Sequence, residues 1–434
     1  MAGFSSSAAI ILAAVLAVFI YTAELSRAPF VLGVGRQKAS TPVSNPNDFH
    51  TIADTVHCED IHYHEPSNLL FTACEGTEST RYGWFPGLGH LDDPTVALKA
   101  QGVLEVIDPR TMKAKRLEFT NFNGPFVTHG IDVIDDPEKP IGEAVYIFAV
   151  NHVPSAAYST DKTTKEPKAR SIIEVFHHVV GSHTVDHIRS VWDPLITTPN
   201  DIVAVSPTSF FVTNDHYYRE GFLRTIETVF FGAKWTNIIH VEFTELTDGS
   251  FRDDDHGVKA SVAMDGLHNG NGLGHGRTAT EILIVSCASG RVHIGEILPA
   301  KDGKGPPTIA AKESVIFESI LDNPSWFRDP YAQKGYDASG VVSASLSRGI
   351  DLGKNSQNPQ GDDGVIVWMA TPTGRKTAQW ETKLLFEDDS TRIRTASAAV
   401  LVAIDPAQEQ GKRKAWLFVT GFMSKSVVAV KVDL

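Results

Sequence analysis

Short motifs of carboxylate and amide side chains recur along this sequence, each beside an apolar run. Carboxylate and amide oxygens are hard ligands, and a calcium ion takes roughly six to eight of them from remote parts of a chain. Asp and Asn also cap turns, so any one motif alone has a purely structural explanation. The motifs are Glu59-Asp60, Asn200-Asp201, Asn214-Asp215-His216, Asn269-Gly270-Asn271-Gly272 and Asp322-Asn323. Together they suggest a divalent cation site only if the fold brings them to one place.

Two histidines stand at the ends of apolar runs, His129 in THGIDV and His152 in AVNHVP. An imidazole with an ordinary pKa near about 6.5 is neutral at pH 7 and suits proton transfer from water. A single histidine in such a place is more often a hydrogen-bonded core or rim residue. Both explanations stay open for each histidine when it is considered alone.

Familiar catalytic motifs are missing from the chain. It contains no GxSxG nucleophile elbow, no HExxH zinc pair and no GxxxxGK[ST] phosphate loop. The glycine-rich string from Gly270 to Gly276 lacks the third glycine of a dinucleotide fingerprint, and it leads into a strand pattern rather than a helix. These absences disfavour serine hydrolases, zinc proteases and nucleotide-binding enzymes.

The composition of the 434 residues is that of a globular protein with an acidic balance. There are 52 acidic and 39 basic residues, a net charge of −13 that repels nucleic-acid phosphates. The three cysteines, Cys58, Cys74 and Cys287, match no zinc pattern. Buried thiols and a single Cys58–Cys74 disulfide in an oxidising compartment both fit. We therefore expect no nucleic-acid partner and no dense disulfide framework.

Beyond about residue 50, the sequence predicts an all-β domain. Runs such as NLLFTAC, EAVYIFAVN, SFFVTN and GVIVWMA are short, rich in Val, Ile and Phe, and bounded by turn residues. The best helical segment lies around residues 219–232. About 24 strands would suit a propeller of six four-stranded blades. No repeat is visible by eye, so periodicity alone gives six blades only as one option.

The N-terminus carries an uncharged apolar stretch from Ala8 to Ala23, followed by Glu24 and Arg27. Its length lies between a signal-peptide core and a comfortable membrane span. We expect residues 1–27 to be a signal peptide or a signal-anchor helix, and residues 28–434 to form a single domain on the extracytoplasmic side of the secretory pathway. A retained helix would associate the protein with a membrane.

Several of these motifs, in this order, resemble the paraoxonase/arylesterase family of calcium-dependent lactonases, from about Glu59 to the C-terminus. The resemblance rests mainly on HGID, VYIFAVNH, PNDIVAVSPTSFFVTNDHYY, FGAKWTNIIHVEF and GNGLG. It implies a six-bladed β-propeller with a central tunnel that holds two calcium ions. It also implies hydrolysis of lactones and aryl esters by water attack, without a covalent nucleophile.

The resemblance assigns roles to individual residues. The catalytic calcium would be held by Glu59, Asn200, Asn271, Asp322 and Asn323, and the structural calcium by Asp60, Asp201 and the backbone carbonyl of Ile131. His129 matches the proposed general base and His152 its supporting partner. Asp215 and His216 would lie near the tunnel, and Phe85 falls where an aromatic pocket residue is expected.

The chain also departs from the animal pattern. The terminal segment VVAVKVDL has no cysteine, so closure of the propeller must rely on strand pairing. The loops near residues 158–169 and 354–363 look like insertions at the entrance. Two other functions stay open: a catalytically silent calcium-stabilised propeller that acts as a binding module at a membrane, and a related sugar-lactonase or strictosidine-synthase-like enzyme. The strings NDIVAV and TNDHYY argue against the second.

Overall fold

A computed structural model describes residues 25–244, 255–300, 303–373 and 379–434. The expected apolar helix over residues 8–23 lies outside these residues. Residues 25–31 form a short helix. Within the described ranges, no helix has the length and apolar character needed to cross a membrane.

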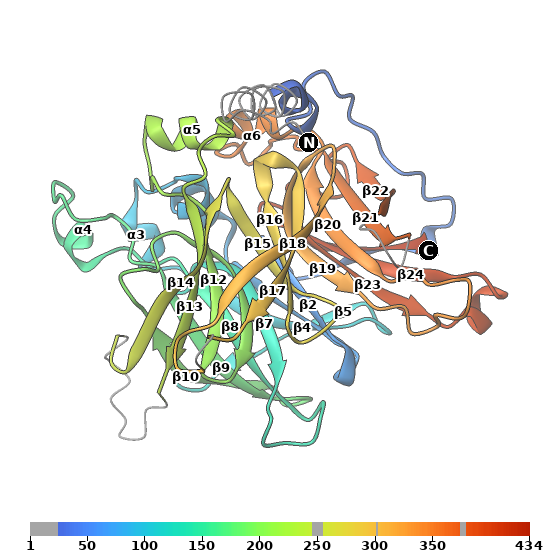
Figure 1. Ribbon diagram of the computed structural model, residues 1–434, viewed down its shortest axis with the longest axis horizontal. Helices are drawn as coiled ribbons and strands as arrows, with labels where there is room; N and C mark the ends of the chain where they lie inside the picture. Colours follow the sequence, from blue (N-terminus) through green and yellow to red (C-terminus); the bar gives the residue numbers. More distant parts are fainter. Residues whose placement is uncertain (1–24, 245–254, 301–302, 374–378) are drawn as a thin grey trace, which may run out of the picture.

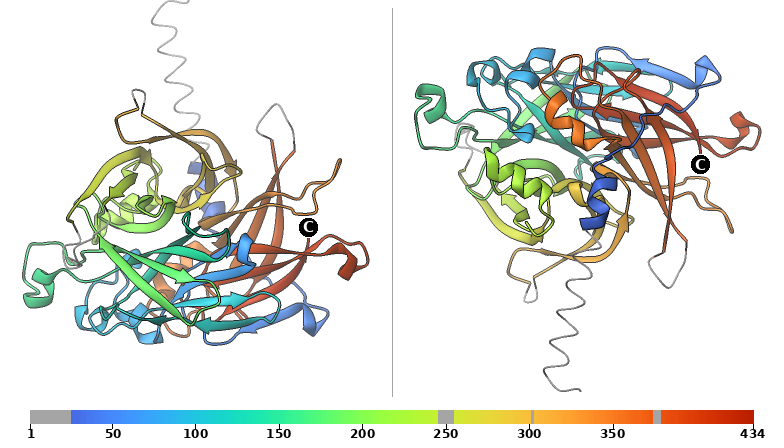
Figure 2. Two further views of the ribbon diagram at one scale, coloured as in Figure 1. Left: turned by 90° about the horizontal axis from the view of Figure 1, so that it is seen from below. Right: turned by 90° about the horizontal axis from the view of Figure 1, so that it is seen from above.

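Six antiparallel sheets are arranged as the blades of a propeller around a central axis (Figures 1 and 2). In chain order, the first three blades are β2 (Asp60–His64), β3 (Leu69–Cys74), β4 (Val103–Asp108) and β5 (Lys113–Arg116); β7 (Thr128–Asp135), β8 (Ala144–Asn151), β9 (Ile172–Val179) and β10 (Thr184–Val191); and β11 (Pro199–Ser206), β12 (Ser209–Asn214), β13 (Thr236–Phe243) and β14 (Val258–Leu267). A short strand, β6 (Glu118–Phe119), adds to β10 in parallel.

The other three blades complete the ring. They are β15 (Gly270–His275), β16 (Glu281–Ser286), β17 (Arg291–Leu298) and β18 (Thr308–Ile316); β19 (Ile320–Phe327), β20 (Gly340–Leu346), β21 (Val365–Pro372) and β22 (Trp380–Asp388); and β23 (Ala396–Ile404), β24 (Lys414–Gly421), β25 (Val427–Asp433) and β1 (Phe49–Ile52). The first strands of neighbouring blades contact one another all around the axis. The all-β, six-bladed prediction is confirmed.

Strand pairing between the two ends of the chain closes the propeller. β1 pairs antiparallel with β25, with Phe49 opposite Val430 and Ile52 opposite Val427. The N-terminal segment thus supplies the outer strand of the blade that the C-terminus builds. A disulfide links Cys58 to Cys74 within the first blade, one of the two options left by the sequence, and Cys287 is a free thiol.

Apolar clusters fill the gaps between adjacent blades. One cluster joins the second blade to the third through Phe148, Ile173, Ile202 and Phe210, and equivalent clusters occupy the other interblade gaps. Both faces of a central strand are therefore covered. This explains why these strands read as unbroken apolar runs rather than as alternating patterns.

Short helices lie outside the sheets. The α-helices are α2 (Glu78–Gly83), α3 (Pro94–Ala97), α4 (Ala156–Thr160), α5 (Phe222–Val229) and α6 (Leu352–Asn355), and the 3-10 turns are η1 (Pro46–Asp48), η2 (Glu65–Ser67), η3 (Pro86–Leu88), η4 (Cys287–Ser289), η5 (Gly349–Asp351) and η6 (Pro406–Glu409). Both α5 and α6 lie at the same end of the propeller (Figure 1). α5 is shorter than the predicted helix because Gly221, at φ 82°, precedes it and Phe230 returns to an extended conformation.

Candidate functional site

An upper cavity of about 370 Å³ opens at the end of the propeller that carries α5 and α6. Its floor is polar, and its wall is largely apolar. The floor includes Glu59, His129, Asn200, Asn269, Asn271 and Asp322, and the wall includes Leu32, Phe85, Leu88, Val229, Leu321, Leu346, Leu352 and Phe422. The cavity therefore offers an apolar sleeve above a ring of oxygen atoms.

The floor residues lie in the first strands of different blades or just before them, and most are at places where the ladder is irregular. The register of β11 with β12 shifts between Pro199 and Ile202, and that of β15 with β16 shifts between Gly270 and Leu273. The same irregularity recurs in β19 between Leu321 and Pro324. A bulge releases residues from the ladder and redirects their side chains. These bulges contain Asn200, Asn271, Asp322 and Asn323, and an equivalent one in β7 contains His129.

The structure brings the five predicted ligands of the catalytic ion to one place. Asn323 Nδ2 donates hydrogen bonds to Glu59 Oε1 at 3.1 Å and Oε2 at 3.3 Å. Asn200, Asn271 and Asp322 line the same cavity as Glu59. None of these contacts is local in sequence, since Asn323 and Glu59 are 264 residues apart.

Four of these five residues keep a buried oxygen without a hydrogen-bond partner. The unpartnered atoms are Oδ1 of Asn200, Asn271, Asp322 and Asn323. A buried polar atom without a partner costs about 1–3 kcal/mol of folding free energy, so four on neighbouring residues, three of which line this cavity, are unusual. A cation seated among them would satisfy all four, and the donor set therefore fits a hard ion.

The carboxylates of this region repel one another. Burial raises the pKa of Glu59 well above its ordinary value, and the nearby charges of Asp322, Asp60 and Asp201 raise it further. Burial and the charges of Asp60 and Asp215 likewise raise the pKa of Asp322. A positive ion would relieve this repulsion.

The predicted ligands of the structural ion form a deeper layer. Asp60 Oδ2 accepts the N–H of Ile131 at 3.0 Å and Oδ1 accepts the N–H of Ile61 at 2.8 Å. Asp201 is held in the same way by Ile202 and Leu273. Burial and the charge of Asp60 raise the pKa of Asp201. The layer is assembled, and ligation through the carbonyl of Ile131 stays a prediction.

His129 and His152 form a buried hydrogen-bonded pair beside the floor. His129 Nδ1 lies 2.8 Å from His152 Nε2, and His152 Nδ1 lies 2.7 Å from Ser171 Oγ. The NH2 group of Asn200, a hydrogen-bond donor, lies 3.4 Å from His129 Nε2. In the tautomer in which each Nδ1 donates away from the cavity, the lone pair of His129 Nε2 faces the floor.

Burial keeps both imidazoles neutral. It lowers the pKa of His129 well below its ordinary value, and the neighbouring His152 and Arg81 lower it further. Burial also lowers the pKa of His152 to about 3, against the opposing charge of Asp215. A neutral imidazole has the protonation form required of a general base, but burial makes it a weaker base than the ordinary imidazole expected from the sequence.

A buried ion pair behind His129 was not anticipated from the sequence. Arg81 donates to the carbonyl of Thr128 at 2.7 Å, and Glu75 accepts the N–H of Thr128 at 3.0 Å. The guanidinium carbon of Arg81 also lies 4.0 Å from the ring centre of Phe85, whose edge packs on His129. Charged residues six apart carry no signal of this role. The pair thus fixes the backbone of Thr128, the residue before His129.

Other predicted features take definite places around the upper cavity. Phe85, Asp215 and His216 line it, as does Arg224 from α5. His216 Nδ1 lies 3.2 Å from Asp215 Oδ1. The insertion near residues 354–363 reaches the mouth through Ser356, whereas the one near residues 158–169 lies outside the lining.

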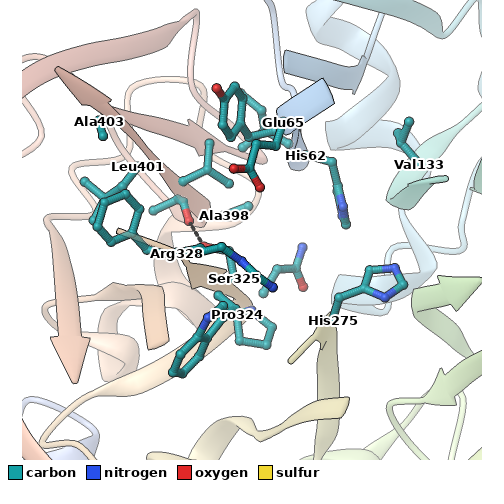
Figure 3. Close-up of a pocket in the computed structure, with 18 of the residues that line it drawn as sticks. His62, Glu65, Val133, His275, Pro324, Ser325, Arg328, Ala398, Leu401 and Ala403 are labelled. Atoms are coloured by element: carbon teal, nitrogen blue, oxygen red, sulfur yellow. Dashed lines mark hydrogen bonds between the residues drawn. The ribbon is translucent and has the colours of Figure 1, made fainter. Parts of the chain in front are cut away.

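A lower cavity of about 430 Å³ occupies the other end of the tunnel (Figure 3). It is lined by later residues of the same first strands, among them His62, His275 and Trp326. His275 Nε2 lies 2.8 Å from Asp132 Oδ2, and His62 bridges Asp132 and Asp60 at 3.2 Å each. Figure 3 shows both histidines on one side of this cavity. Glu59 and Asn200 line the upper cavity, whereas Asp60 and Asn323 line the lower one, so the predicted ligands lie between the two cavities.

Across the described part of the chain, no three His, Cys, Asp or Glu side chains are grouped as metal ligands. The floor agrees with this, because it contains only two predicted carboxylate ligands, Glu59 and Asp322, and takes its other oxygens from asparagines. Such a mixture excludes a zinc-type site and suits an ion that accepts amide oxygen.

Comparison with known proteins gives one family-model match and three similar curated proteins. The Arylesterase family model matches residues 114–259. Serum paraoxonase/arylesterase 2 of Gallus gallus is 28% identical over 173 residues, which cover 40% of each chain, and serum paraoxonase/arylesterase 1 of Mus musculus is 26% identical over 209 residues, 48% of this chain and 47% of the relative. Serum paraoxonase/arylesterase 2 of Homo sapiens is 26% identical over 216 residues, 49% of this chain and 50% of the relative.

The chain thus spans about half the length of the curated relatives it matches, or less. A solved luciferin-regenerating enzyme aligns over 89% of this chain and 95% of its own, at 11% identity and a TM-score of 0.43. The family-model match and the curated relatives support the paraoxonase/arylesterase family for this chain.

Proposed function

We propose that this chain is a calcium-dependent hydrolase of lactones and aryl esters. The observation that carries the proposal is the group of unpartnered oxygens on the floor, next to a neutral histidine pair and beneath an apolar sleeve. The family match makes esters and lactones the first substrates to consider. The missing serine and zinc motifs are consistent with direct attack by water.

The residues that would hold the catalytic calcium are Glu59, Asn200, Asn271, Asp322 and Asn323. When bound there, calcium supplies a Lewis acid that polarises an ester carbonyl and stabilises negative charge on its oxygen. Glu59 and Asp322 would contribute the charge of the site, and the three asparagines would add neutral oxygens. A second calcium ion at Asp60, Asp201 and Ile131 would stabilise the tunnel.

His129 would act as the general base on the attacking water. Its Nε2 lone pair faces the floor, and Asn200 Nδ2 is a weak donor to it at 3.4 Å that a water molecule can replace. His152 accepts the hydrogen bond from His129 Nδ1 and so fixes the ring, while Ser171 fixes His152. The pair orients one imidazole and keeps its proton-accepting nitrogen directed at the floor.

The wall of the upper cavity would bind the acyl or aryl part of the substrate. Phe85, Leu321 and Phe422 present apolar surface directly above the floor. Burial of apolar surface in this sleeve would orient an ester head group towards the oxygens.

We further infer an extracytoplasmic location in the secretory pathway, with membrane association through the N-terminal stretch, from the apolar run Ala8 to Ala23.

The test is hydrolysis of phenyl acetate and of aliphatic lactones of several chain lengths by the purified protein. Activity is measured as purified, after chelation, and after calcium is restored. The proposal predicts activity that chelation abolishes and calcium restores. A folded, calcium-loaded protein that hydrolyses none of these substrates would contradict it and would favour the binding-module function instead.

A further inference from the structure

Asn269 is a buried asparagine of the upper cavity whose whole amide lacks a partner. It is 4% exposed and lines the cavity beside Asn271. Among the described residues, neither its Oδ1 nor its Nδ2 has a hydrogen-bond partner. The neighbouring floor asparagines differ, because Asn200 and Asn323 each direct their NH2 group to a protein acceptor.

The backbone prevents Asn269 from turning away from the cavity. Its φ of 46° is in the left-handed region, which a residue other than glycine adopts at a cost. Its carbonyl accepts the N–H of Cys287 at 3.0 Å, and the N–H of Gly270 is held by Thr236 at 2.8 Å. The left-handed turn is thus anchored on both sides, which keeps the amide at the cavity.

A cation on the floor accounts for only part of this amide. A metal ion satisfies an oxygen, whereas an NH2 group requires a hydrogen-bond acceptor. This holds for either orientation of the amide, since neither of its two polar atoms has a hydrogen-bond partner. An ester or lactone group carries two acceptor oxygens and no donor. A buried amide donor and an ester therefore match in hydrogen-bonding chemistry.

We propose that Asn269 donates a hydrogen bond from its NH2 group to an ester or lactone oxygen of the substrate. This inference rests on the proposed function. Asn269 then orients the ester head group on the floor while the apolar wall holds the rest of the molecule. Loss of one such donor in a water-poor site lowers kcat/KM by roughly tenfold to a thousandfold.

The test uses Asn269→Gly, because glycine adopts the left-handed conformation without strain and removes only the amide. Asn68→Gly is the matched control. Asn68 has a φ of 55° and an oxygen that accepts Tyr63 OH, and it lies at the lower cavity. Asn269→Asp is the second variant, since it keeps the shape and replaces the donor by an acceptor.

Each protein is assayed for kcat/KM on phenyl acetate and δ-valerolactone, and the calcium affinity of the chelated protein is measured by titration calorimetry. We expect both Asn269 variants to lose at least tenfold in kcat/KM, Asn269→Gly to keep its calcium affinity within about threefold, and Asn68→Gly to match the wild type in both.

Two results for Asn269→Gly would overturn the inference. A parallel loss of calcium affinity would make Asn269 a metal ligand, and unchanged kcat/KM would leave it without a role towards substrate. Retention of full activity by Asn269→Asp would also exclude the donor. If the wild type hydrolyses neither probe, the proposed function itself fails, and this inference falls with it.

Discussion

The floor of the upper cavity and the deeper layer beneath it are built from neighbouring residues but have opposite hydrogen-bonding states. Glu59 and Asn200 line the upper cavity, and the residues that follow them, Asp60 and Asp201, belong to the deeper layer. Successive side chains of an extended chain point in opposite directions, so each pair serves both layers. The Oδ1 atoms of Asn200, Asn271 and Asp322 on the floor have no hydrogen-bond partner, whereas both carboxylate oxygens of Asp60 and of Asp201 accept backbone N–H groups.

This difference shows what each layer requires. The deeper carboxylates are held by the fold itself, and His62 bridges Asp60 to Asp132. Burial alone would lower the pKa of His62, but the two carboxylates raise it well above its ordinary value. Each carboxylate oxygen has two lone pairs, so these contacts leave room for the predicted second ion. The floor depends on an external ion to satisfy its oxygens.

The largest effect is expected from Asp322→Asn, which removes one of the two negative charges on the floor at constant shape. Calcium affinity and kcat/KM should fall together, the latter by at least about a hundredfold. Calorimetry and the phenyl acetate assay measure the two losses. Asp329→Asn is the control, because Asp329 is a buried carboxylate that accepts the N–H groups of Tyr331 and Ala338 far from the floor.

His129→Gln should lower turnover by roughly a hundredfold to ten-thousandfold and leave calcium bound, because it removes the base while all the oxygen atoms of the predicted ligands remain. The measurement is kcat together with calcium content. His293→Gln serves as the control, since His293 is hydrogen-bonded to Ser286 and Ser314 away from the site. Loss of calcium in His129→Gln would show that the histidine supports the floor rather than the water.

Arg81→Lys should lower kcat by about tenfold with little change in KM. Lysine keeps the positive charge but lacks the planar guanidinium group that hydrogen-bonds to Thr128. The equivalent change Arg413→Lys, at a partly buried arginine paired with Asp329, should alter thermal stability alone. Equal effects of the two changes on kcat would mean that the Glu75–Arg81 pair does not position His129.

The pH dependence of stability should distinguish the apo protein from the calcium-bound protein. The pKa values of Glu59 and Asp322 are raised in the folded state, so the folded protein binds their protons more tightly than the unfolded chain does. The contribution of these two carboxyls to the stability of the chelated protein should fall as the pH rises above about 4, whereas the buried histidines contribute in the opposite sense. Calcium should remove this dependence, as measured by denaturant unfolding with and without calcium. A stabilisation by calcium that does not grow as the pH rises above about 4 would contradict the repulsion.

The smallest effect on turnover is expected from His275→Gln in the lower cavity. This change removes the 2.8 Å contact with Asp132 and should lower the unfolding free energy by about 1–3 kcal/mol. Because the floor and the deeper layer separate His275 from the upper cavity, kcat/KM should stay within about twofold. A large loss of turnover would show that the two ends of the tunnel are functionally coupled.

The sequence predicted the class of fold from the apolar runs, and the resemblance supplied the number of blades and the two ligand layers. The bulges that contain Asn200, Asn271 and Asp322 could not be predicted from the sequence. A bulge is a shift in the register between two paired strands, so it depends on the partner strand as well. The Glu75–Arg81 pair and the Ser171 contact to His152 were also missed, since each depends on packing between distant segments. The N-terminal apolar stretch and the location of the protein stay predictions.

The most direct test of the difference between the floor and the deeper layer is a crystal structure grown with calcium, with the ions located by anomalous diffraction. We predict an ion within about 2.3–2.6 Å of oxygens from Glu59, Asn200, Asn271, Asp322 and Asn323. The same map tests the second ion near Asp60 and Asp201. A calcium-loaded protein with no anomalous peak on the floor would contradict the central claim.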